Sequence, residues 1–218
     1  MSARGLSAAG EAGTDGPAFE PPRVEVRPGR LAVICGPMFS GKSSELLRRV
    51  RRARRARIPV LLCKPVTDTR FPTVRSHDGL EVEAVAVRHG SQVVEAARAI
   101  GPGGLVAVDE AQFLEGLVEA AQTLVARGCA VALAGLDLDY RGLPFGEMPV
   151  LLALADEVVK LSAVCVRCGA EASRTQRLVG GSPAGLGELV LIGGAEAYEP
   201  RCLACWVDPA SVTAPSRH

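Results

Sequence analysis

A glycine-rich segment at residues 36–43 constrains the fold of this chain more than any other part of the sequence. It reads Gly-Pro-Met-Phe-Ser-Gly-Lys-Ser and satisfies the pattern GxxxxGK(S/T) in full. It directly follows an apolar run at residues 30–35 and leads into residues 43–57, which contain no Gly or Pro. This order of strand, loop and helix distinguishes a phosphate-binding loop from a chance glycine turn.

The chemistry of such a loop is phosphate recognition. Its backbone N–H groups point at phosphate oxygens, and the start of the following helix adds partial positive charge. We therefore expect the loop to bind ATP, with Lys42 reaching the β- and γ-phosphates and Ser43 ligating magnesium. The loop residues assigned to ATP and Mg²⁺ are Gly36, Pro37, Met38, Phe39, Ser40, Gly41, Lys42 and Ser43.

A triphosphate site also needs an acidic group at the end of a neighbouring strand. Asp109 and Glu110 end the apolar run that begins at residue 104. Asp109 suits the magnesium shell, whereas Glu110 suits a general base for a hydroxyl nucleophile. The alternative is a solvated acidic pair at the start of a helix. Gln112 is assigned to the ATP and magnesium group.

The remaining apolar runs indicate an α/β fold. Residues 59–64, 104–109 and 130–136 are predicted strands, and residues 114–127 have the apolar period of an amphipathic helix. Residues 150–161 should add a helical turn and another strand. Near-continuous apolar strands that alternate with helices predict a P-loop NTPase-like parallel sheet flanked by helices.

Changes in composition suggest boundaries along the chain. Residues 1–22 are rich in Ala, Gly, Ser and Pro and are expected to be a disordered extension. A P-loop kinase domain is expected at 23–162, a small zinc-binding domain at 163–207, and a flexible tail at 208–218. No apolar run approaches the ~20 residues of a membrane span, so we expect a cytoplasmic protein.

Four of the seven cysteines form two CxxC pairs. Such pairs supply the tetrahedral thiolate shell of a structural zinc ion, and redox-active CxxC is the competing interpretation. A closed shell leaves no open position for catalysis, so the zinc is expected to hold a loop, far from the phosphate chemistry. The predicted ligands are Cys165, Cys168, Cys202 and Cys205. The other three, Cys35, Cys63 and Cys129, are expected to pack inertly in the core.

Seven arginines follow the phosphate loop between residues 48 and 57 and raise the question of nucleic-acid binding. They are spread around the predicted helix, no aromatic residues interleave with them, and the net charge of the chain is only +1. We therefore expect a solvated or subunit-contacting helix and no nucleic-acid partner.

Taken together, these motifs closely resemble the zinc-containing thymidine kinases. The resemblance covers residues 30–206 and rests on the order and spacing of its pieces. These are GPMFSGKSSELLRRVRR, KPVTDTRF at 64–71, SHDG at 76–79, DEAQF at 109–113, GLDLDYRGLPFG at 135–146, VVKLSAVCVRCG and IGGAEAYEPRCLAC.

The resemblance implies a substrate-covering (lasso) loop in the zinc-binding domain and roles for individual residues. Glu110 matches the general base that takes the proton of the nucleoside 5′-hydroxyl, and Asp68 and Arg70 match residues near the magnesium and the transferring phosphates. Arg70 therefore joins Glu110 and Lys42 in the catalytic group. Residues matching the nucleoside pocket are Met38 and Thr175 beside the thymine methyl group, Phe113, Leu136 and Tyr140 on its walls, Leu189, Val190, Leu191, Ile192 and Gly193 in the base-binding loop, and Tyr198, which closes on the nucleoside.

The expected function is phosphorylation of thymidine, and of deoxyuridine, by ATP in nucleotide salvage. Two alternatives stay open: a P-loop kinase for another nucleoside or small alcohol, and a zinc-ribbon ATPase that acts on nucleic acid. The sequence does not separate them, because Glu110 serves to activate either a hydroxyl or a water. By resemblance, the protein is also expected to form a homotetramer and to be inhibited by dTTP.

Overall fold

The computed structural model describes residues 27–66, 73–75, 81–189, 194 and 196–212. A six-stranded sheet in the order β5-β2-β6-β7-β1-β8 forms its centre, and all neighbouring strands run parallel. The strands are β1 (Leu31–Cys35), β2 (Val60–Pro65), β5 (Val85–Val87), β6 (Leu105–Val108), β7 (Ala130–Gly135) and β8 (Glu157–Lys160).

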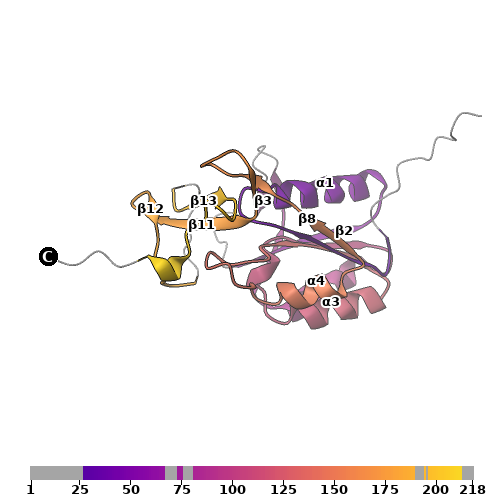
Figure 1. Cartoon of the computed structure of the whole chain (residues 1–218). Coiled ribbons are helices and arrows are strands. Elements are labelled where there is room, and N and C mark those ends of the chain that lie inside the picture. Colours follow the sequence, from indigo (N-terminus) through magenta and orange to yellow (C-terminus); the bar gives the residue numbers. More distant parts are fainter. Residues whose placement is uncertain (1–26, 67–72, 76–80, 190–193, 195, 213–218) are drawn as a thin grey trace, which may run out of the picture.

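Helices cover both faces of this sheet (Figure 1). On one face lies α1 (Lys42–Arg55), and on the other lie α2 (Gly90–Ala96), α3 (Leu117–Ala126) and α4 (Met148–Leu154). Successive residues of β1 enter opposite layers, since Val33 packs in the layer of α3 and Ile34 in that of α1. A strand buried on both faces must be apolar throughout, which explains the continuous apolar runs of the sequence.

The predicted parallel sheet flanked by helices is confirmed. The structure adds β5 and α2, which the sequence did not indicate. It also starts α3 at Leu117 and not at residue 114 as predicted, because Gly116 precedes the helix with a left-handed φ of 68°. Ala111–Phe113 form a separate 3₁₀ turn, η2. Among the described residues, no helix is both long enough and apolar enough to cross a membrane.

Shorter strands gather beyond one end of the sheet (Figure 1). In the centre of an antiparallel trio, β11 (Arg174–Val179) pairs with β12 (Ser182–Pro183) and β13 (Tyr198–Arg201). The other short elements are the pair β9 (Ala163–Val164) and β10 (Glu171–Ala172), the pair β3 (Thr73–Arg75) and β4 (Glu81–Glu83), and the 3₁₀ turns η1 (Ala97–Ala99) and η3 (Pro209–Ser211).

The arginine-rich helix α1 is only partly solvated. Arg54, Arg55 and Arg57 are exposed, as expected for a solvated surface. Arg49 is buried instead, and its guanidinium contacts Glu45 at 2.9 Å and Glu157 at 2.7 Å. The second contact ties α1 to the edge strand β8, so this arginine has a structural partner within the chain.

Candidate active site

The phosphate loop joins β1 to α1 through unusual backbone angles. Gly36 has a φ of 137°, Phe39 of 66° and Gly41 of 88°. A Cβ atom on Gly36 would lie 2.2 Å from the carbonyl oxygen of Leu161, so only glycine fits there. The loop is thus pressed against the segment that follows β8, which fixes its position at the carboxyl edge of the sheet.

Lys42, Ser43 and Asp109 meet at this edge. Lys42 Nζ is buried and donates to the carbonyl oxygen of Pro37 at 2.6 Å, and burial lowers the pKa of Lys42. Ser43 Oγ donates to Asp109 Oδ1 at 3.1 Å. Burial, followed by the charge of Glu110, raises the pKa of Asp109 to about 7. A buried carboxyl group beside a second acid and a hydroxyl fits the oxygen ligands that Mg²⁺ prefers.

Glu110 occupies a strained position directly after Asp109. Its φ of 52° and ψ of 41° are left-handed, which is uncommon outside glycine and is found often at functional sites. Its Oε2 accepts a hydrogen bond from Gln112 Nε2 at 2.6 Å, and Gln112 Oε1 accepts from the backbone N–H of Leu136 at 3.0 Å. The structure thus places the Gln112 amide between Glu110 and the end of β7.

Residues assigned to the nucleoside pocket lie beside the phosphate loop. Tyr140 and Tyr198 are buried in one apolar cluster, and Met38 packs against it. Thr175 of β11 is buried, and its Oγ1 accepts a hydrogen bond from the backbone N–H of Met38 at 3.0 Å. Four predicted residues are therefore brought together, and one of them belongs to the phosphate loop.

The other described pocket residues are less closely grouped. Phe113 packs edge-on against Phe145, with ring centroids 5.4 Å apart, and Leu136 is held by Gln112. Leu189 is 40% exposed. The predicted residues Asp68, Arg70, Val190, Leu191, Ile192 and Gly193 lie outside the described part of the chain.

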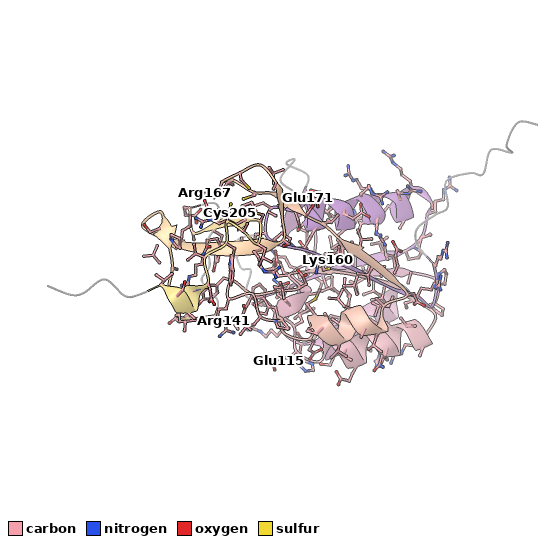
Figure 2. The ribbon with its side chains drawn as sticks, in the orientation of Figure 1. Glu115, Arg141, Lys160, Arg167, Glu171 and Cys205 are labelled. Atoms are coloured by element: carbon pink, nitrogen blue, oxygen red, sulfur yellow. The ribbon has the colours of Figure 1, made fainter. Side chains whose placement is uncertain are left out.

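Sequence reasoning missed three charged residues near the site, namely Arg177, Asp137 and Lys160. Tyr140 Oη donates to the carbonyl oxygen of Gly187 and accepts from its N–H, at 3.1 and 2.9 Å, while the buried Arg177 guanidinium lies 5.1 Å from the Tyr140 ring centre. Lys160, labelled in Figure 2, pairs at 2.9 Å with Asp137, which follows β7. The place of Asp137 just after an apolar strand was the one available signal, and Arg177 had none.

The predicted zinc ligands form a cluster. Possible ligand atoms of Cys165, Cys168, Cys202 and Cys205 all lie within 4.8 Å of one another. The sulfur atoms of Cys168 and Cys202 are 3.6 Å apart, close to the ~3.8 Å edge of a tetrahedron with Zn–S bonds of ~2.3 Å. Figure 2 labels Cys205 in this part of the molecule.

The thiols of this cluster need a cation to become thiolates together. Hydrogen bonds from backbone N–H groups, that of Cys202 first, lower the pKa of Cys165 to about 6. The neighbouring Cys168 side chain raises the pKa of Cys205 to about 12. Two turns build the site, since the N–H of Gly169 donates to the Cys165 carbonyl and that of Trp206 to the Cys202 carbonyl. This donor set fits a structural zinc ion.

The remaining cysteines pack in the core, as predicted. Cys35, Cys63 and Cys129 are buried. Burial raises the pKa of Cys35 to about 11 and that of Cys63 to about 12, so both stay neutral thiols. That the zinc lies far from the phosphate chemistry stays a prediction; the structure does connect the two regions, because β11 supplies Thr175 to the phosphate loop and pairs with the strand that leads into Cys202.

Comparison with known proteins identifies a family and shows more distant likenesses. The model of the family described as "Thymidine kinase" matches residues 29–206. The chain is also similar to the flagellar accessory protein FlaH from Methanocaldococcus jannaschii, with 13% identity, a TM-score of 0.46, and coverage of 73% of this chain and 78% of that one. For the Thermotoga maritima RuvB Holliday junction branch migration motor, identity is 12%, the TM-score is 0.37, and coverage is 61% of this chain and 38% of that one.

Proposed function

The chain belongs to the thymidine kinase family, and we propose that it transfers the γ-phosphoryl group of ATP to the 5′-hydroxyl of thymidine, and of deoxyuridine, to give the monophosphate in nucleotide salvage. The observation that supports this most directly is the position of Glu110. It follows the proposed magnesium ligand Asp109, and the Gln112 amide holds its carboxylate at the same edge as the phosphate loop.

The proposed reaction is an in-line displacement. Glu110 accepts the proton of the 5′-hydroxyl as its oxygen bonds to the γ-phosphorus, and the bond from that phosphorus to the β,γ-bridging oxygen breaks, so that ADP leaves. Lys42, and by resemblance Arg70, stabilise charge on the moving phosphoryl group. Ser43 and Asp109 would hold Mg²⁺, which neutralises phosphate charge when bound.

Specificity is proposed to come from two sides of the base. Met38 and Thr175 are proposed to flank the thymine methyl group, and their side chains belong to elements joined by a hydrogen bond of 3.0 Å. Backbone groups of residues 189–193 are proposed to read the imide edge. An amino group at the 4-position would reverse that pattern and leave buried polar groups unpaired, so cytidine should be rejected.

A nucleoside panel with labelled ATP tests this proposal. Thymidine and deoxyuridine should give monophosphate, while cytidine and a blank without nucleoside give background. Glu110→Gln keeps the shape of the side chain but removes the base, so turnover should fall by about 10²-fold or more while ATP still binds. Glu119→Gln, an exposed position on α3, is the matched control and should keep normal turnover.

Two results would contradict the proposal. Thymidine turnover no higher than that of cytidine, together with ATP hydrolysis that rises with DNA, would favour the nucleic-acid ATPase instead. Near-normal turnover of Glu110→Gln would remove the role of Glu110 but not the kinase activity itself.

Assembly and regulation are proposed from the family resemblance. We propose a homotetramer inhibited by dTTP, the triphosphate end product. Light scattering on the zinc-loaded protein should give four times the chain mass of 22.7 kDa. If dTTP inhibits by binding at the nucleoside acceptor site, added thymidine should relieve the inhibition. Inhibition that thymidine does not relieve would contradict binding of dTTP at that site.

A further inference from the structure

Gln112 lies between Glu110, the proposed general base, and the central sheet. It belongs to η2, the 3₁₀ turn that follows Glu110, and only 4% of its surface is exposed. The sequence placed Gln112 with the ATP ligands, yet its two amide ends are already engaged within the protein. One faces Glu110 at 2.6 Å, and the other faces the backbone of Leu136 at 3.0 Å.

The orientation of this amide follows from its partners. The backbone N–H of Leu136 only donates, so the amide oxygen of Gln112 must face it. The amide nitrogen then faces Glu110 Oε2, where an ionised carboxylate only accepts. The alternative flip would set donor against donor and acceptor against acceptor. Gln112 therefore forms a fixed bridge from the end of β7 to the Glu110 carboxylate.

Two glycines leave the space in which Gln112 sits. A Cβ atom on Gly135 would lie 2.7 Å from Gln112 Oε1, and one on Gly146 would lie 2.5 Å from the Gln112 carbonyl oxygen. A side chain at Gly146 would collide with the Gln112 backbone, and one at Gly135 would displace the Gln112 amide from its present position. Both glycines therefore allow close approach to Gln112, whereas Glu110 has a strained left-handed backbone and is only half-buried.

We propose that Gln112 is a positioning residue for the general base: it holds Glu110 Oε2 and thereby directs Oε1 at the acceptor hydroxyl. This inference rests on the proposed phosphoryl transfer. An ATP ligand would have to give up the bond to Glu110 or to Leu136 before it reached a phosphate. A positioning residue needs both bonds to persist during the reaction.

A double-mutant cycle separates these roles. In the zinc-loaded full-length protein, Gln112→Met should lower kcat for thymidine by about 10- to 10²-fold, since misplacement of a reacting group by ~1 Å has effects of that size. The Kd of ATP should stay within about twofold, because no ATP contact is removed. In a Glu110→Gln background the same substitution should change kcat by less than about twofold, because no base remains to be positioned.

Companion variants keep the test decisive. Gln112→Glu retains the shape and the acceptor for Leu136 but places a second carboxylate against Glu110, so it should also lower kcat and serves if Gln112→Met does not fold. Gln122→Met, the same change at an exposed site on α3, should leave kcat unchanged.

Each outcome has a distinct meaning. An equal loss of kcat in both backgrounds would show a merely structural role and overturn the inference. A Kd of ATP raised more than about fivefold with kcat retained would show an ATP ligand and overturn it as well. If the unmodified protein phosphorylates thymidine normally but the effects of the two substitutions on kcat simply add, only the positioning role is rejected. If the unmodified protein does not phosphorylate thymidine, both the proposed function and this inference are rejected.

Discussion

The hydrogen bond between the Met38 N–H and Thr175 Oγ1 joins the phosphate loop to β11, and its removal should weaken ATP binding. Thr175→Val replaces the hydroxyl with a methyl group of similar size. The side chain still fills its buried position, but the Met38 N–H loses its acceptor. The substitution therefore isolates one hydrogen bond between two segments that are distant in the sequence.

The size of the effect follows from the environment of the bond. A donor left unpaired in a buried site costs about 1–3 kcal/mol. The N···O distance of 3.0 Å is that of an ordinary bond, and Met38 is only half-buried, so water can partly replace the hydroxyl. The lower part of the range, about 1–1.5 kcal/mol, applies. If ATP binding must reorder the loop, the Kd of ATP should rise about five- to twelvefold.

Thr175→Ser provides the complementary change, because it keeps the hydroxyl and removes the methyl group. Its Kd of ATP should stay within about twofold, while its KM for thymidine should rise if the methyl group packs on the base. Isothermal titration of the zinc-loaded protein with a non-hydrolysable ATP analogue measures the first quantity. Equal Kd values for the Val variant, the Ser variant and the unmodified protein would refute the reasoning that this bond orders the loop.

Three further predictions use other parts of the structure. Chelation of zinc should shift the fluorescence of Trp206, the only tryptophan, to longer wavelength, because its backbone is bonded to a cysteine turn; unchanged emission after verified metal loss would contradict this. Burial raises the pKa of Asp109 to about 7, so in Mg²⁺-free protein the folded state should lose stability as the pH rises from about 4 to 7. Asp109→Asn removes this buried charge and should raise Tm by at least about 2 °C at pH 8 and by much less at pH 5. The same substitution should abolish turnover. Equal Tm gains at both pH values would argue against a buried charge. Gly36→Ala places a Cβ 2.2 Å from the Leu161 carbonyl oxygen and should abolish ATP binding, whereas Gly101→Ala, with open space around it, should keep it.

Features that depend on neighbours in the sequence were predictable. The apolar runs at β1, β2, β6 and β7 predict a sheet that is buried on both faces. The phosphate loop and the Asp109–Glu110 pair each consist of consecutive residues, so the sequence alone reveals them. In contrast, β5 has three residues, and Val85 and Ala86 are exposed, so no burial pattern marked it. A strand this short is held by pairing with β2 and not by its own composition.

Features that depend on contacts across the chain were not predictable. The hydrogen-bond partner of the Gln112 amide oxygen is the N–H of Leu136, which follows β7 and lies 24 residues further along the chain, and no local pattern distinguishes such an amide from one that binds a phosphate. Arg49 is a second example of a contact that the sequence does not reveal. The six other arginines around it suggested a solvated surface, but Arg49 is buried because it pairs with Glu157 of β8. Local sequence patterns therefore indicate which residues belong to a site, but the role of each residue depends on its tertiary contacts.

The position of the cysteine cluster links it to both proposed substrate sites. The strand β13 ends directly before Cys202, and within it Pro200 pairs with Thr175 of β11. The carbonyl oxygen of Pro200 also accepts a hydrogen bond from the N–H of Val166, which lies inside the first CxxC turn. Both cysteine turns thus hold the strand that is paired with Thr175, and Thr175 holds Met38 in the phosphate loop. We therefore expect metal removal to lower the affinity for ATP as well as that for the nucleoside, whereas a metal that fixed only the base-binding loop would leave the affinity for ATP unchanged when removed.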